Sequence, residues 1–308
     1  MRPMSCRKKT LWISWQGEEG LPRFYPLPVC VRRETALLHI GYWDKAREQA
    51  YRNLEAAESA GSVSDAANCR YNLAGFCGRF GELDKAMHLY LLAMDYFDET
   101  GDKTRAHLAI WNIGNVYKER REYEKAIEHY RRALEVFLAK DLFREAATIL
   151  GDLGEILTDL SEYAEAEQCF RRAIGLSRKH RCLRSLSEAL GKSARFCLKS
   201  GDIEAALTML EESLAINRSM RDRRGIAGEL LAMGEVEMGR GMPGRAFIYF
   251  REALDISTEI NDEIGASRAR EKVDGAAALI DGQATERQKN ISKINYTRGV
   301  ESCTKHSR

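Results

Sequence analysis

Proline is scarce in this sequence of 308 residues, which has only 5, four of them within residues 1–28. No further proline occurs until Pro243. Because proline is the strongest helix breaker, the long stretch between them can be helical throughout. The content of 44% hydrophobic and 31% charged residues is that of a folded chain rather than a disordered one. A largely helical protein is the first expectation.

Long apolar runs are also missing. No window reaches the roughly 18 to 20 apolar residues that cross a bilayer. A basic segment at residues 2–9 is followed by only five apolar-leaning residues, 11–15. That run is shorter than the roughly 7 to 15 residues of a secretory signal. We therefore expect a cytoplasmic protein with no membrane span.

The motifs of metal and catalytic chemistry are absent from the sequence. The 8 cysteines are scattered, and no two stand at C-x-x-C spacing. We find no H-E-x-x-H, no glycine-rich phosphate loop and no G-x-S-x-G. The sequence predicts no metal, no cofactor and no catalytic residue, and hence a protein that is not an enzyme.

What the sequence does contain is an internal repeat with a period of 40 residues. One position of the repeat is always alanine: Ala46, Ala86, Ala126, Ala166, Ala206 and Ala246. The position four residues later is large in five units: Tyr90, Tyr130, Phe170, Leu210 and Phe250, with Ala50 in the first. A period of this length indicates a solenoid of stacked units.

Each unit reads as two helices packed against each other. Residues 108–120 carry apolar side chains at helical spacing, a turn follows, and residues 124–139 form the second helix. Gly114 and Ala126 allow the two backbones to approach closely. The turns carry Gly41, Gly81, Ser161, Gly201 and Gly241 at the same interval, with Arg121 as the exception.

This pattern resembles the tetratricopeptide repeat (TPR) family. The residues that carry the resemblance are Ile113, Gly114, Tyr117, Tyr123, Ala126, Tyr130 and Ala133. The 40-residue unit is similar to the longer repeats of kinesin light chains and G-protein-signalling modulators. The resemblance implies an all-α, right-handed superhelical solenoid of about six helix-turn-helix units.

The composition divides the chain into three parts. Residues 1–30 fit no repeat, and we expect an irregular N-terminal arm. The solenoid occupies residues 31–280, and its last segment, about 263–280, is expected to be a helix that caps the final unit. Residues 281–308 are polar and basic, which predicts a disordered tail.

In the TPR family the first helix of each unit lines a concave face that binds extended peptides. This geometry places Tyr71, Asn72, Trp111, Asn112, Asn115 and Lys118 on that face. An amide side chain can both donate to and accept from a peptide backbone, so the asparagines are candidate peptide-binding residues. The alternative is that they join neighbouring units and that Trp111 is wedged between repeats.

The charges on the first helices change sign between units 4 and 5. Unit 4 presents Asp152, Glu155 and Asp159, and unit 5 presents Lys192, Arg195 and Lys199 at equivalent positions. We predict that these three bases bind the acidic groups of a partner. Gly151 and Gly191 leave bulk missing beside them, either for an inserted partner side chain or for close helix packing.

A second basic set lies in loops that should share one edge of the solenoid. This predicted rim comprises Arg178, Lys179, Arg181, Arg184, Arg221, Arg223 and Arg224. It suits phosphates or acidic protein segments, although solvated surface charge explains it equally.

The sequence therefore predicts a protein-interaction scaffold or adaptor that binds an extended peptide or acidic partner segment in its groove. Two alternatives stay open. The rim could bind nucleic acid or another anionic surface, or the chain could be a regulatory subunit of a larger signalling or transcriptional system.

Overall fold

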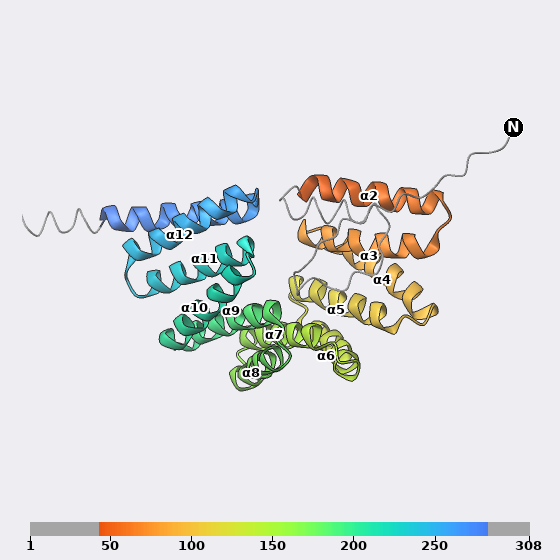
Figure 1. The fold of residues 1–308 in the computed structure, drawn as a ribbon, viewed down its shortest axis with the longest axis horizontal. Helices are drawn as coiled ribbons and strands as arrows, with labels where there is room; N and C mark the ends of the chain where they lie inside the picture. Colours follow the sequence, from red (N-terminus) through yellow and green to blue (C-terminus); the bar gives the residue numbers. More distant parts are fainter. Residues whose placement is uncertain (1–42, 283–308) are drawn as a thin grey trace, which may run out of the picture.

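The structure is a computed structural model that describes residues 43–282 (Figure 1). The predicted arm, the first helix of unit 1 and the tail from residue 283 lie outside the described residues. The helices are α2 (Trp43–Ser59), α3 (Val63–Arg79), α4 (Leu83–Glu99), α5 (Lys103–Glu119), α6 (Tyr123–Ala139), α7 (Phe143–Asp159), α8 (Tyr163–Lys179), α9 (Leu183–Ser200), α10 (Ile203–Ser219), α11 (Arg223–Gly239) and α12 (Pro243–Glu259). A further helix covers residues 263–282.

The helices pack in consecutive pairs, as the repeat predicts, and the prediction of an all-α solenoid is confirmed. Helix α2 is the second helix of unit 1, and units 2 to 6 are α3/α4, α5/α6, α7/α8, α9/α10 and α11/α12. The helix at 263–282 follows unit 6, where we expected a cap at about 263–280. Helix α5 begins five residues before the predicted residue 108, because the Asp102 side chain caps it by accepting from the Arg105 backbone N–H at 3.0 Å.

The turns between helices share one backbone geometry. A residue with positive φ stands every 20 residues: Gly61, Gly81, Gly101, Arg121, Asp141, Ser161, Arg181, Gly201, Arg221, Gly241 and Asn261. After each one, the next N–H bonds back to a carbonyl five residues earlier, as Glu122 does to Tyr117 at 2.9 Å. Arg121, with φ 60°, adopts the same turn as the glycines. It is therefore an exception in sequence but not in conformation.

The two helices of a unit are held together by a small residue that faces a large ring. A Cβ added at Gly114 would lie 2.7 Å from the Tyr130 ring, and one at Gly154 would lie 2.6 Å from Phe170. Tyr130 and Phe170 are almost fully buried. Backbone and ring are thus in direct contact, which sets the distance between the paired helices.

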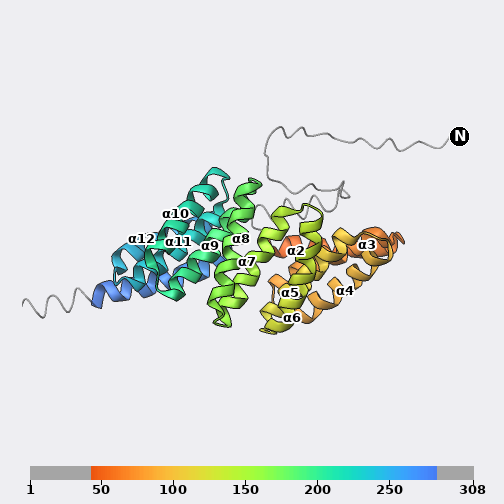
Figure 2. The same cartoon turned by 90° about the horizontal axis from the view of Figure 1, so that it is seen from below.

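The stacked pairs curve into an arch whose two ends, unit 2 and the start of the helix at 263–282, lie close together (Figures 1 and 2). In Figure 1 the chain descends from α2 on one side, passes α7 and α8 at the bottom, and returns through α12. The ends approach closely enough for an ion pair, with Arg79 Nη2 at 3.7 Å from Asp262 Oδ1. A residue of unit 2 therefore contacts the start of the last helix.

Candidate functional site

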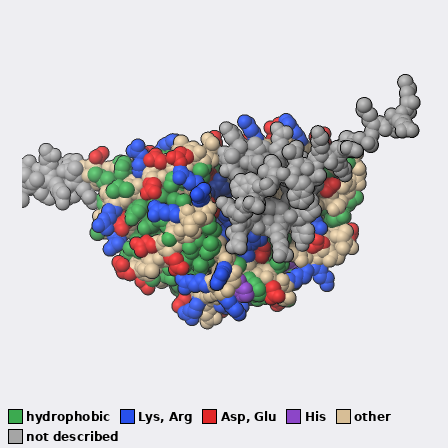
Figure 3. Space-filling view, in the orientation of Figure 1, with side chains coloured by type: hydrophobic (Ala, Val, Ile, Leu, Met, Phe, Trp, Pro, Cys, Tyr) green, Lys and Arg blue, Asp and Glu red, His purple; other side chains and the backbone are tan. Residues whose placement is uncertain are grey.

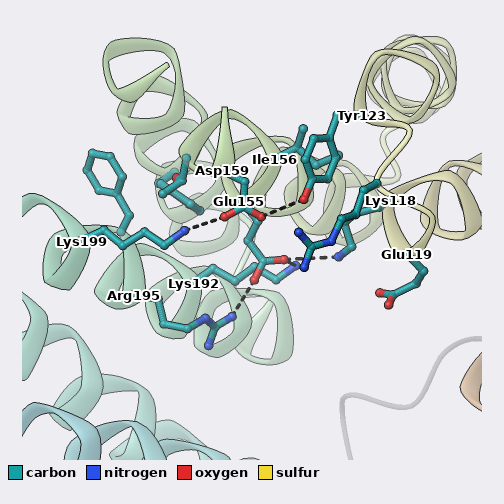
Figure 4. Close-up of a pocket in the computed structure, with 13 residues that line it drawn as sticks. Lys118, Glu119, Tyr123, Glu155, Ile156, Asp159, Lys192, Arg195 and Lys199 are labelled. Atoms are coloured by element: carbon teal, nitrogen blue, oxygen red, sulfur yellow. Dashed lines mark hydrogen bonds and ion pairs between the residues drawn. The ribbon is translucent and has the colours of Figure 1, made fainter. Parts of the chain in front are cut away.

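The candidate site lies on the surface formed by the first helices of the units, α3, α5, α7, α9 and α11, which we call the groove face. A pocket of about 500 Å³ opens there between α5, α7 and α9 (Figure 4). Its walls carry Lys118 and Glu119 from α5, Glu155 and Asp159 from α7, and several residues of α9. Side chains from α6 and α8 contribute Tyr123 and Phe170.

The acidic and basic sets predicted on units 4 and 5 face each other and form a ladder of ion pairs. Lys192 pairs with Asp152, Arg195 Nη2 lies 2.7 Å from Glu155 Oε1, and Lys199 Nζ lies 2.6 Å from Asp159 Oδ1. Each pair joins residues 40 apart in the sequence. The three bases are thus engaged by their own chain, and their predicted role with a partner stays a prediction.

Glu155 is the centre of this ladder. Its second oxygen lies 3.4 Å from both Lys118 Nζ and Lys192 Nζ, while Arg195 holds the first. Burial disfavours the charged carboxylate, but the three cations outweigh it and lower the pKa of Glu155 to about 2. The side chain is therefore a carboxylate throughout the physiological pH range.

Lys192 lies along the surface of α7 with only 16% of its side chain exposed. Burial favours the neutral amine, but the carboxylates of Asp152 and Glu155 outweigh it and raise the pKa of Lys192. Its Cδ would be 3.2 Å from a Cβ at Gly151, and the Glu229 carboxylate would be 2.7 Å from one at Gly191. Gly151 and Gly191 thus leave room for side chains of the neighbouring unit. This agrees with the alternative that the glycines serve close packing within the protein.

Two of the predicted asparagines, Asn112 and Asn115, belong to a chain of hydrogen bonds across units 2 and 3. Asn112 Nδ2 donates to the Tyr71 hydroxyl at 2.7 Å, Asn115 Nδ2 donates to Asn112 Oδ1 at 3.3 Å, and the Tyr130 hydroxyl donates to Asn115 Oδ1 at 2.5 Å. Burial raises the pKa of Tyr71 to about 12, although the bond from Asn112 lowers it in part, so the hydroxyl keeps its proton. Asn72 is half-buried, and its amide makes no hydrogen bond within residues 43–282.

Trp111 links units 3 and 4. Its half-buried ring packs on the core that these units share, and its indole N–H donates to Asp152 Oδ2 at 3.0 Å. This is the contact expected of a ring wedged between repeats.

Most arginines of the predicted rim are paired with acids, three of them with acids that follow their own unit and Arg223 with an acid of the same unit. Arg178 contacts Glu212 at 2.7 Å, Arg184 contacts Asp222 at 2.8 Å, Arg224 contacts Asp262 at 3.1 Å, and Arg223 pairs with Glu259. Lys179, Arg181 and Arg221 are exposed and form no ion pair with the described residues. On the face shown in Figure 3, basic and acidic side chains are interspersed. The rim therefore offers three separate cations rather than a continuous basic strip.

Sequence reasoning did not select the residues that complete the pocket. Lys118 was placed on the groove face but given no role, and Arg121 was treated only as a turn residue. Phe196 stands directly after Arg195 and contributes an apolar wall. The helical spacing from Asn115 to Lys118 was a usable signal, whereas Arg121 and Phe196 reach the pocket only through the stacking of units 3 to 5.

Within residues 43–282, no group of three or more His, Cys, Asp and Glu side chains has the arrangement of a metal site. Over the same range, no helix combines the length and hydropathy that a bilayer crossing needs.

The family model for the tetratricopeptide repeat matches residues 106–179 and 145–219, which cover units 3 to 5. Residues 106–219 are tetratricopeptide repeats. The matched repeats contain the whole pocket, and the same register extends through the helices on either side. No curated protein sequence matches this chain.

Solved structures share the TPR fold at low sequence identity. BtubC (BKLC) from P. vanneervenii is 20% identical, with 76% of this chain and 93% of that chain covered and a TM-score of 0.52. A Rap protein complexed with Competence and Sporulation Factor is 14% identical, with 82% and 75% covered and a TM-score of 0.61. The Rap conjugation gene regulator of the plasmid pLS20, in complex with the Phr* peptide, is 16% identical, with 71% and 65% covered and a TM-score of 0.59. At these identities the likeness establishes the fold of the TPR chain alone.

Proposed function

We propose that this chain is a non-catalytic scaffold or adaptor that binds an extended segment of a partner protein along its groove face. The observation that carries the proposal is the pocket of about 500 Å³ in the middle of that face, lined by polar and charged side chains from three units. Structures with the same fold have been solved with bound factors, one of them a peptide. The proposal assigns the same mode of binding to this chain.

The amide groups beside the pocket support recognition of a peptide backbone. An Asn side chain carries two N–H donors, and the hydrogen bonds of Asn112 and Asn115 use one each. The remaining donors, together with the whole amide of Asn72, are available to the carbonyl groups of an extended chain. Such contacts hold a segment in place whatever its side chains are.

The paired state of the rim favours this function over nucleic-acid binding. An arginine that already contacts a carboxylate must give up that contact before it can neutralise a phosphate. A regulatory role within a larger system is compatible with the proposal, since a regulatory subunit also needs a surface for its partner.

Selection from a display library of random linear peptides tests the proposal with the full chain as the target. We expect selected peptides to bind the wild type and to bind Asn72→Ala and Asn112→Ala about tenfold more weakly, the cost of one lost hydrogen bond. Asn72→Ala is the cleaner variant, because the Asn112 change also removes the partner of Tyr71.

The matched control is Arg171→Ala on α8, whose side chain is 72% exposed and lies outside the pocket. Fluorescence anisotropy measures the Kd, and circular dichroism checks that each variant stays folded. The proposal fails if no peptide is selected, or if every selected peptide binds the groove variants and the wild type equally.

A further inference from the structure

We infer that the pocket between α5, α7 and α9 is a specificity site for an acidic side chain of the bound segment, with an apolar side chain next to it. The inference rests on the proposed function, because it identifies what the groove selects. The sequence predicted that three bases of unit 5 bind the partner's acidic groups. The inference assigns this role to a group of cations that also includes Lys118 and Arg121.

The first argument is a surplus of positive charge at the centre of the pocket. Five cations line the pocket (Lys118, Arg121, Lys192, Arg195 and Lys199) with three carboxylates (Glu119, Glu155 and Asp159), and Asp152 pairs with Lys192, which leaves one positive charge in excess. The other pair of the ladder, Lys199 with Asp159, is balanced. A further carboxylate entering the pocket would neutralise the surplus at a site where charges are only partly exposed to water.

The second argument is that the surplus cations have hydrogen-bond donors to spare. Lys118 Nζ lies 3.4 Å from Glu155 and 4.0 Å from Asp152, both long for an ammonium-carboxylate contact. Arg195 reaches Glu155 through a single nitrogen, and 51% of its side chain is exposed. Arg121, at the mouth, is exposed and forms no ion pair among residues 43–282. These three side chains present N–H groups from two sides of the opening.

The third argument is the apolar wall beside these donors. Phe196 is half-buried, and its ring centroid lies 5.6 Å from that of Phe170 and 6.1 Å from that of Tyr163. Phe170 and Ile156 complete the apolar lining. An aliphatic or aromatic side chain of the partner can therefore pack on Phe196 while the neighbouring acid meets the cations.

The position of the pocket identifies the source of the carboxylate. Unit 2 lies on one side of it and unit 6 on the other, so an extended segment on the groove face continues past it in both directions. The acid is then an internal Asp or Glu side chain rather than a free C-terminus. A nucleic-acid backbone fits less well, because a small excess of positive charge in one pocket cannot neutralise a series of phosphates.

The experiment sequences the peptides selected by the full-length wild type and measures their Kd values. We expect enrichment of Asp or Glu adjacent to Leu, Ile, Phe or Tyr. Replacing that acid by Asn or Gln should weaken binding about tenfold or more, the loss expected for a charge-assisted hydrogen bond. Replacing the free C-terminal carboxylate by an amide should leave the Kd unchanged.

A charge exchange makes the test specific to the pocket. Lys118→Glu should weaken binding of the acidic peptide. The same variant should bind a peptide with Lys in place of the acid more tightly than the wild type does. The matched control is Lys179→Glu, an equal charge change at an exposed rim position, which should do neither. Circular dichroism confirms the fold of both variants.

The outcomes separate the two proposals. Selected peptides without an enriched acid, or acidic peptides that bind Lys118→Glu and the wild type equally, overturn the inference but leave the proposed function standing. Loss of binding on amidation also overturns it, because the ligand is then a C-terminal carboxylate. Failure to select any peptide overturns both.

Discussion

Single glycines determine how closely the paired helices of this protein approach. Gly154 stands against the Phe170 ring, and Gly114 stands against Tyr130 in the same way. Unit 5 reaches a different solution, with Ala194 at the glycine position and Leu210 at the ring position, both buried in one cluster. The extra methyl group is accommodated there beside Leu210, and unit 2 accommodates one too, with Ala74 and the Tyr90 ring in one buried cluster.

Gly154→Ala should lower the unfolding free energy by about 1 to 3 kcal/mol, because its Cβ would stand 2.6 Å from the Phe170 ring. The double variant Gly154→Ala, Phe170→Leu copies unit 5 and should lose less than the two single variants together. Thermal unfolding of the four proteins measures this coupling. Strictly additive losses would contradict the packing explanation.

The Glu155 carboxylate links stability to pH. Its pKa is about 2 in the folded protein and 4.5 without the surrounding structure, so it stabilises the fold above pH 4.5 and loses this effect as the pH falls towards 2. Glu155→Gln should therefore cost up to about 3 kcal/mol at pH 7 and progressively less below pH 4.5.

Unfolding monitored by circular dichroism at pH 7, 5 and 3 checks this dependence. Glu167→Gln is a suitable control, because Glu167 is 58% exposed and contacts only Arg171. A difference between Glu155→Gln and wild type that stays constant from pH 7 to pH 3 would exclude the ion-pair origin.

At the scale of the helix, α2 to α12 each have 17 residues followed by a turn of three, except α9, which has 18 residues and a turn of two. The turn always contains a left-handed residue, which is a glycine in only some units. Arg221 occupies this position with φ 54° and Gly241 occupies it with φ 72°. Because a side chain disfavours the left-handed region, the non-glycine turns carry a conformational cost.

Arg221→Gly should raise the unfolding free energy by about 0.5 to 1 kcal/mol, the relief of left-handed strain less the entropy cost of glycine. Gly241→Ala should lower it by about 1 kcal/mol, since no atom lies within 4 Å of the added Cβ and only the backbone is strained. Differential scanning calorimetry measures both. Equal shifts of one sign would show that these turns do not depend on backbone preference.

At the scale of the molecule, the arch is closed by contacts between residues distant in the sequence. Asp262 is 10% exposed in its side chain and contacts Arg224 at 3.1 Å as well as Arg79 at 3.7 Å. In a solenoid each unit otherwise contacts only its neighbours, so small changes between units add up along the chain. Arg79 therefore holds together ends that the stacking alone leaves free to separate.

Arg79→Ala should increase the radius of gyration and the maximum dimension in small-angle X-ray scattering. The change in unfolding free energy should stay within about 1 kcal/mol, as for other partly exposed ion pairs. Raising the salt to roughly 1 M should move the wild type in the same direction. Arg178→Ala, which removes a pair between adjacent units, is the control and should leave the scattering unchanged.

The sequence by itself determined the repeat, the helix pairing and the residues of the groove face. Each of these depends on interactions within one unit or between adjacent units. The residues that make such interactions recur every 40 positions in the sequence. The register of Ala126 and Tyr130 predicted the pairing of α5 and α6 correctly. The turn at Arg121 was predicted, but its left-handed conformation was not, because the helices on either side impose that conformation.

Only the tertiary structure decided which charges meet. The sequence predicted an acidic patch (Asp152, Glu155 and Asp159) adjoining a basic one (Lys192, Arg195 and Lys199). Stacking pairs their side chains with each other. The contact between Arg79 and Asp262 left no periodic trace, because the curvature that produces it is the sum of small rotations over five units. The sequence determines how each unit packs on the next one. The sum of these small rotations along the superhelix determines which residues distant in the sequence become neighbours.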